Sequence, residues 1–174
     1  GPETGVGNDP TRVRVGSGPS LVLTVTDHLV LDGNGDGVFS PGDILEYRIE
    51  AHNRSTTAAD NLLVRLTPDA RTGLVLGTTT TDTGAVVLGN TTGDASILVN
   101  LDDLAPGQRA RIATRVTPSG VFPVDLNTIQ VQATADSLST GEVLSDDPDT
   151  VPVGDPTRTP LGLKPRLAVT KTAV

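Results

Sequence analysis

The sequence contains no cysteine, so it offers neither a disulfide bond nor a thiolate for metal binding, redox chemistry or covalent catalysis. Methionine and tryptophan are also absent, and aromatic residues make up 2% of the chain. Lysine occurs only as Lys164 and Lys171, which excludes a lysine–asparagine isopeptide bond within residues 19–147. No apolar run approaches the roughly 20 residues of a membrane-spanning helix. We therefore expect a fold stabilised without covalent cross-links and without insertion into a membrane.

Positively charged residues are also scarce. The 13 lysine and arginine residues are outnumbered by 21 aspartate and glutamate residues, which gives a net charge of −8. Nucleic acids and anionic membranes would repel such a chain, so we expect neither as a partner.

The residues that are abundant favour strands. Valine and threonine are frequent, and 13 prolines leave little room for long helices. Apolar and polar residues alternate with a period of two in 44–53, 109–116 and 128–135, and Tyr47 falls on the apolar face. Shorter candidate strands are 20–26, 62–67, 74–80, 85–88 and 96–101. The pattern predicts an all-β, immunoglobulin-like β-sandwich of about eight strands, with a β-barrel as the alternative.

An internal repeat joins the two ends of the chain. Residues 9–12 (Asp-Pro-Thr-Arg) recur as residues 155–158, and nine of the eighteen positions from 9 to 26 are identical to those 146 residues later, without a gap. Such self-similarity indicates a tandem array with a period of 146 residues. We predict that 1–18 is the tail of a preceding repeat or a linker, and that 19–147 is one complete repeat. Residues 148–165 would then form a Pro/Asp-rich connector, and 166–174 the first strand of the next repeat.

One segment carries a specific chemical motif, the twelve residues from 32 to 43. Oxygen-bearing side chains stand at its positions 1, 3, 5, 9 and 12, and a glycine stands at position 6, which is the spacing of an EF-hand-type calcium loop. Calcium prefers six to eight oxygen ligands, and Gly37 would permit the sharp bend that lets alternate residues point inward. The predicted ligands are the side chains of Asp32, Asn34, Asp36, Ser40 and Asp43 and the carbonyl oxygen of Val38.

Two further observations limit this prediction. Asp, Asn and Gly are also ordinary turn formers, so a plain surface turn is the alternative. Strand-like patterns flank the loop where an EF-hand has helices, which favours a structural calcium clip over a calcium sensor. Bringing three carboxylates together without a cation would be costly, so we expect calcium binding to be coupled to local folding.

With these residues placed, the sequence resembles bacterial extracellular immunoglobulin-like tandem repeats. The resemblance rests on the segments 23–26 (Leu-Thr-Val-Thr), 40–43 (Ser-Pro-Gly-Asp), 47–53, 104–107 (Leu-Ala-Pro-Gly) and 127–131. It spans about 20–135 and implies a structural domain of a surface stalk, adhesin or envelope protein, with no catalytic residues to assign. The calcium loop inserted before Pro41 and the low lysine content depart from that pattern.

No other group of residues indicates catalysis. His28 and His52 are the only histidines, and two imidazoles without further ligands do not form a zinc site. We therefore expect a non-enzymatic, calcium-stabilised repeat at the bacterial cell surface, with neighbouring repeats of the same chain as its partners. The alternatives are a protein- or glycan-binding module that uses its loops, including 78–95, and a subunit of an extracellular filament in which 166–174 completes the sheet of a neighbouring molecule.

The predicted connector has two interpretations. Asp146, Asp147, Asp149 and Asp155 lie beside prolines, which is typical of a semi-stiff spacer whose like charges favour extension. The same carboxylates would alternatively form a second calcium site between successive repeats.

Overall fold

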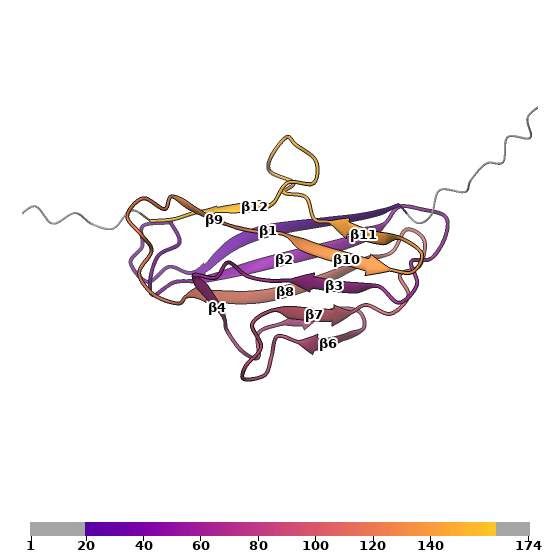
Figure 1. Cartoon of the computed structure of the whole chain (residues 1–174), viewed down its shortest axis with the longest axis horizontal. Helices are drawn as coiled ribbons and strands as arrows, with labels where there is room; N and C mark the ends of the chain where they lie inside the picture. The colour runs from indigo at the N-terminus through magenta and orange to yellow at the C-terminus, as the bar shows by residue number, and fades with distance from the viewer. Residues whose placement is uncertain (1–19, 163–174) are drawn as a thin grey trace, which may run out of the picture.

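A computed structural model describes residues 20–162. The predicted tail 1–18 and the predicted strand 166–174 lie outside these residues. The described chain is all-β, with twelve strands and two five-stranded antiparallel sheets that enclose one apolar core (Figure 1). The predicted immunoglobulin-like β-sandwich is therefore confirmed, whereas the predicted number of about eight strands is too low. Nowhere in residues 20–162 does the chain form a helix that is long and apolar enough to cross a bilayer.

The first sheet is built around the two longest pairings of the fold. Its strand order is β1-β2-β8-β4, and β5 pairs with another part of β8. The register places Leu23 opposite Ala51 and Ile49 opposite Ile112, so the apolar faces of three strands coincide. The bounds are Leu21–Leu31 for β1, Ile44–Asn53 for β2, Arg109–Pro118 for β8, Thr72–Leu74 for β4 and Thr80–Thr81 for β5.

The second sheet consists of strands of four or five residues in the order β11-β10-β3-β7-β6. Their short lengths follow from the glycines, prolines and Asp/Asn turns that separate the apolar runs. The bounds are Gly141–Leu144 for β11, Ala133–Ser137 for β10, Leu63–Leu66 for β3, Ile97–Asn100 for β7 and Ala85–Leu88 for β6.

One predicted strand serves two sheets. The segment predicted as 128–135 is β9 (Thr128–Val131), which pairs with β12 (Thr157–Pro160), followed by β10, which pairs with β3 and β11. Alternate residues stay buried across the change at Gln132, whose side-chain amide donates to the carbonyls of Ser145 and Gly154. Part of the predicted connector 148–165 therefore forms an edge strand of the domain, whereas the tandem arrangement stays a prediction.

The core confirms the predicted strand faces. Leu45, Tyr47, Ile49 and Ala51 are at most 2% exposed. Glu46 lies on the opposite face of β2 yet is 7% exposed, because Arg48 and Arg115 flank its carboxylate at 2.8 and 2.9 Å. The burial of this polar residue follows because long arginine side chains can cover a neighbour while their charged heads remain in water.

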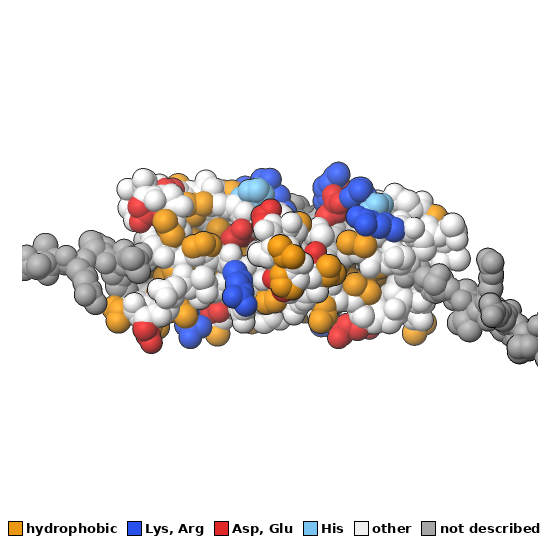
Figure 2. Space-filling model, turned by 90° about the horizontal axis from the view of Figure 1, so that it is seen from above, with side chains coloured by type: hydrophobic (Ala, Val, Ile, Leu, Met, Phe, Trp, Pro, Cys, Tyr) orange, Lys and Arg blue, Asp and Glu red, His pale blue; other side chains and the backbone are white. Residues whose placement is uncertain are grey.

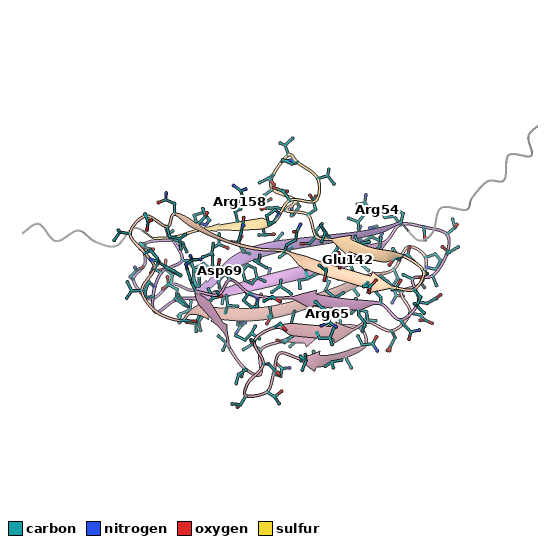
Figure 3. The ribbon with its side chains drawn as sticks, in the orientation of Figure 1. Arg54, Arg65, Asp69, Glu142 and Arg158 are labelled. Atoms are coloured by element: carbon teal, nitrogen blue, oxygen red, sulfur yellow. The ribbon has the colours of Figure 1, made fainter. Side chains whose placement is uncertain are left out.

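The described chain begins and ends at opposite ends of the long axis (Figure 1). We call the end that holds Ser20 the N-terminal pole; it also contains the loops 54–61, 102–108 and 138–140. Arg54, labelled in Figure 3, marks this end, and its N–H donates to the Ser20 carbonyl at 2.8 Å. The other end, the C-terminal pole, contains the loops 32–43 and 119–127 together with Gly162.

Candidate metal centre

The predicted calcium loop connects β1 to β2 at the C-terminal pole. Its two ends are held together because Leu31 pairs with Ile44 in the ladder of the first sheet. Within the loop, Phe39 is 2% exposed and forms a parallel β-bridge with Leu161. The loop is therefore anchored at both ends and at one internal point, while residues 33–37 are exposed.

The first predicted ligand, Asp32, organises the start of the loop. Its two carboxylate oxygens accept hydrogen bonds from the N–H groups of Gly35 at 2.7 Å and Gly37 at 2.8 Å. The Gly37 N–H, assisted by that of Gly35, holds the pKa of Asp32 below its usual value. Gly37 has φ 75°, a conformation that favours glycine, so the predicted sharp bend is present.

The last predicted ligand, Asp43, is the buried end of the loop, at 1% exposure. One of its carboxylate oxygens accepts from the N–H of Gly33 at 2.8 Å. The other accepts from the N–H of Ser40 at 2.8 Å and from the Ser40 hydroxyl at 2.9 Å. A single carboxylate thus joins positions 2, 9 and 12 of the loop.

The middle ligands are bonded to each other. The Asn34 side-chain amide donates to Asp36 at 2.9 Å and to the Ser40 hydroxyl at 3.2 Å. The other Asp36 oxygen accepts from the N–H of Val38 at 2.8 Å. In this arrangement, no three acidic or histidine side chains within residues 20–162 converge closely enough to hold a metal ion.

The donor set nevertheless has the composition that calcium prefers. Every predicted ligand is a carboxylate, amide, hydroxyl or carbonyl oxygen, and the loop contains no nitrogen or sulfur ligand that would favour zinc or copper. Asp32, Asp43 and Ser40 are already fixed by hydrogen bonds, and a carboxylate oxygen that accepts one N–H retains a second lone pair. An ion would have to displace the hydrogen bonds that Asn34 donates to Asp36 and to the Ser40 hydroxyl, and the carboxylates would have to converge further than they do here.

The loop also contacts the point where the described chain ends. The Gly162 N–H donates to the Phe39 carbonyl at 3.0 Å. A Cβ atom at Gly162 would lie 3.2 Å from the Ser40 Cβ and 3.4 Å from a carboxylate oxygen of Asp36. A side chain at this position would therefore require the loop to shift by a few tenths of an ångström.

The connector carboxylates occupy a different place. The segment from Asp146 to Asp155 forms a loop that protrudes from the side of the sandwich, away from both poles (Figure 1). Asp147 is 5% exposed and accepts from the N–H of Asp149, while Asp155 accepts from the Thr150 hydroxyl at 2.7 Å. The other Asp155 oxygen is buried and has no hydrogen-bond partner among residues 20–162. The loop thus lies away from both ends of the domain, and the second calcium site between successive repeats stays a prediction.

A groove of about 670 Å³ crosses the outer face of the first sheet. Glu46 pairs with Arg48 and Arg115, and Glu50 pairs with Arg109 and Arg111, so four arginines face two glutamates on this sheet. In Figure 2 both histidines lie along one edge of the molecule beside several arginine side chains, while other arginines lie elsewhere on the face shown. The residues that line the groove include Thr24, Thr26, His28, Arg48, Asp82 and Arg111.

Sequence reasoning did not find this basic face or the bridge between Phe39 and Leu161. A signal for the first was present, because Arg109, Arg111 and Arg115 alternate on one face of their strand. Their partners on β2 became identifiable only with the register of the sheet. No local signal links Phe39 to Leu161, which lie far apart in the sequence.

The chain matches no protein-family model and no curated protein. Among solved structures it is similar to a variant of BcpA, the major pilin subunit of Bacillus cereus, with a TM-score of 0.53 and 12% identity over 82% of this chain and 40% of the pilin. It is also similar to the major pilin SpaD of Corynebacterium diphtheriae, with a TM-score of 0.51 and 12% identity over 71% of this chain and 34% of the pilin. An uncharacterized Nocardia farcinica protein with an immunoglobulin-like fold gives a TM-score of 0.45 and 17% identity over 79% of this chain and 97% of that protein. The chain thus spans well under half the length of either pilin, and at these identities the likeness shows the fold alone.

Proposed function

We propose that this chain is a non-catalytic, calcium-stabilised structural repeat of a large protein on the bacterial cell surface. The observation that carries the proposal is the loop 32–43, in which each ligand position of a calcium loop bears an oxygen donor. The 146-residue internal repeat supports the tandem arrangement. The fold shared with two bacterial pilin subunits supports an extracellular, structural role.

The residues of the loop would hold the ion with different degrees of preorganisation. Asp43 and Ser40 are buried and preorganised, whereas Asn34 and Asp36 are exposed and would complete the coordination shell. Calcium, when bound, supplies positive charge that offsets the repulsion among three carboxylates. Because Phe39 and Gly162 tie the loop to the C-terminal pole, order in the loop would extend to the end of the domain.

The test is thermal unfolding with calcium and with a chelator. Binding to the native state alone raises stability by about 2.7 kcal/mol at a hundredfold excess of ligand over Kd. For a domain of this size that corresponds to a rise in Tm of roughly 5–11 °C. We expect Asp36→Ala to lose most of this rise. Asp60→Ala removes an exposed carboxylate at the N-terminal pole and should keep the rise. A wild-type Tm that a chelator does not change would contradict calcium stabilisation.

The tandem part of the proposal has a separate test. Sequencing the gene on both sides of this segment should reveal further copies at the 146-residue period. Flanking sequence without such a copy would contradict the array.

A second candidate function, ligand binding, is favoured by the groove on the first sheet. Thr80 and Asp82 of the predicted binding segment 78–95 line it together with Arg48 and Arg111. Within the groove Arg48 and Arg111 are matched by Glu50 and Asp82. On the sheet face around it, however, four arginines face two glutamates, which suits an anionic protein or glycan. A sulfated polysaccharide such as heparin is a suitable probe. Salt-sensitive binding that Arg111→Ala weakens would support this function, and equal binding by Arg111→Ala would contradict it.

A further inference from the structure

The internal repeat and the bounds of the domain together define the link between successive repeats. Gly162 is hydrogen-bonded to the domain, and Leu21 begins β1. At the 146-residue offset, Arg166 corresponds to Ser20 and Leu167 to Leu21. Only residues 163–165 then separate the end of one domain from the start of the next.

A link this short restricts the distance between the domains. An extended chain advances about 3.3–3.6 Å per residue, so the first residue of the next domain lies within about 14 Å of Gly162. A proline precedes the first residue of the domain in both copies, as Pro19 and Pro165. The proline ring fixes the φ angle at this point of the link. Because the chain enters at one pole and leaves at the other, the C-terminal pole of each domain must lie next to the N-terminal pole of its successor (Figure 1).

The two poles carry apolar side chains that remain exposed in full or in part. Val121 and Val124, in the loop 119–127 of the C-terminal pole, are 68% and 77% exposed. Val30 and Leu31, at the end of β1 on the same pole, are also exposed. On the N-terminal pole, Leu138 at the tip of the β10–β11 hairpin is fully exposed. Contact between the poles would remove these side chains from water, which stabilises association.

The glycine at the end of the domain gives further support. Gly162 lies so close to Ser40 and Asp36 that an added Cβ would make tight contacts, and the equivalent position in the preceding copy is Gly16. The repeat therefore keeps a glycine at the position where the described domain ends.

We propose that the C-terminal pole, through Val30, Leu31, Val121 and Val124, packs against the N-terminal pole of the following copy, so that successive repeats form a stiff end-to-end rod. This inference rests on the tandem part of the proposed function. The loop 32–43 belongs to the packed pole, which places the proposed calcium site beside the junction.

The inference can be tested in a tandem protein made of residues 1–165 followed directly by residues 20–174, which adds one period to the full chain. Spin labels attach selectively to introduced cysteines because the native chain has none. Suitable sites are Arg65→Cys in the first copy and Glu142→Cys in the second; both side chains are exposed, on β3 and β11 (Figure 3). Double electron–electron resonance then measures the distance distribution between the two domains. We expect one narrow peak.

The decisive variant carries Val121→Asp and Val124→Asp in the first copy and should lose that narrow peak. The matched control carries Val151→Asp and Val153→Asp, which are 95% and 92% exposed on the side loop, and should keep it. The Tm of each variant in the full single chain verifies folding. A broad distribution in the unsubstituted tandem protein, or a narrow peak retained in the junction variant, would overturn the inference.

This result is separable from the calcium test. A narrow peak that is unchanged by a chelator, in a protein whose Tm also ignores calcium, supports the junction and contradicts calcium stabilisation. A broad distribution in a protein whose Tm rises with calcium overturns the junction and leaves the calcium proposal intact.

Discussion

Removal of the Phe39 side chain should detach the candidate metal loop from the core. Phe39 is 2% exposed, its ring lies 5.9 Å from that of Phe122, and its backbone bridges Leu161. Truncating a buried phenylalanine to alanine typically costs about 3–5 kcal/mol. Because domains are stable by only about 5–15 kcal/mol, Phe39→Ala should remove a large part of the free energy of unfolding.

Urea unfolding of the variants measures this effect. Val87→Ala, at a side chain that is 54% exposed, serves as the control and should change the free energy of unfolding by less than about 0.5 kcal/mol. A double-mutant cycle with Phe122→Ala should give a coupling of about 0.5–1.5 kcal/mol for the aromatic pair. Calcium should also bind Phe39→Ala more weakly, because the binding-competent loop is less populated. A loss below about 1 kcal/mol in Phe39→Ala would refute the anchoring of the loop by the core.

Two further predictions concern stability. Gly84→Ala should lower Tm by roughly 6–12 °C, because Gly84 has φ 72° and a Cβ there would lie 1.9 Å from the Asn100 carbonyl oxygen. Gly77 has φ 77° and no atom lies within 4 Å of the new Cβ, so Gly77→Ala should lower the free energy of unfolding by only about 1–2 kcal/mol. An equal fall in Tm in Gly77→Ala and Gly84→Ala would contradict the steric argument. Acid should destabilise the domain. Burial opposes ionisation of Glu46, yet its two arginine partners hold its pKa below the ordinary value of 4.5. The N–H group of Gly89, followed by that of Thr91, holds the pKa of Asp94 below the ordinary value of 3.8. The two ionised carboxylates stabilise the domain fully above these ordinary pKa values, and this stabilisation is lost as the pH falls through their lower folded-state pKa values. The Tm should therefore decline below about pH 4.5. The decline should be less steep in Glu46→Gln.

The sequence was most informative where apolar alternation was long. The predicted strand 44–53 coincides with β2, because four apolar residues alternate with charged ones and a single face is buried. The predicted strand 74–80 is wrong, since only Thr72–Leu74 and Thr80–Thr81 form strands and the residues between them turn. Strand β12 was missed because Thr157–Pro160 lacks apolar alternation and is held by its pairing with β9.

The candidate site divides in the same way. The spacing of oxygen donors and the bend at Gly37 are local properties, and the sequence predicted both. The contacts of Phe39 and Gly162 depend on two segments more than a hundred residues apart, so no local pattern indicates them. The sequence placed the domain boundary at residue 147, whereas Thr157–Pro160 still pairs with β9. The sequence could not separate these cases, because proline and aspartate are typical of connectors as well as of edge strands and turns.

The most direct test of calcium binding is an amide NMR titration of the calcium-free protein with calcium. We expect saturation at one ion per domain, with the largest shifts at the N–H groups of Gly33, Gly35 and Gly37, whose acceptors are predicted ligands. Smaller shifts should reach Gly162, which is bonded to the same loop. Saturable shifts centred on Asp146–Asp155 instead, or no saturable shift in the loop 32–43, would contradict this expectation.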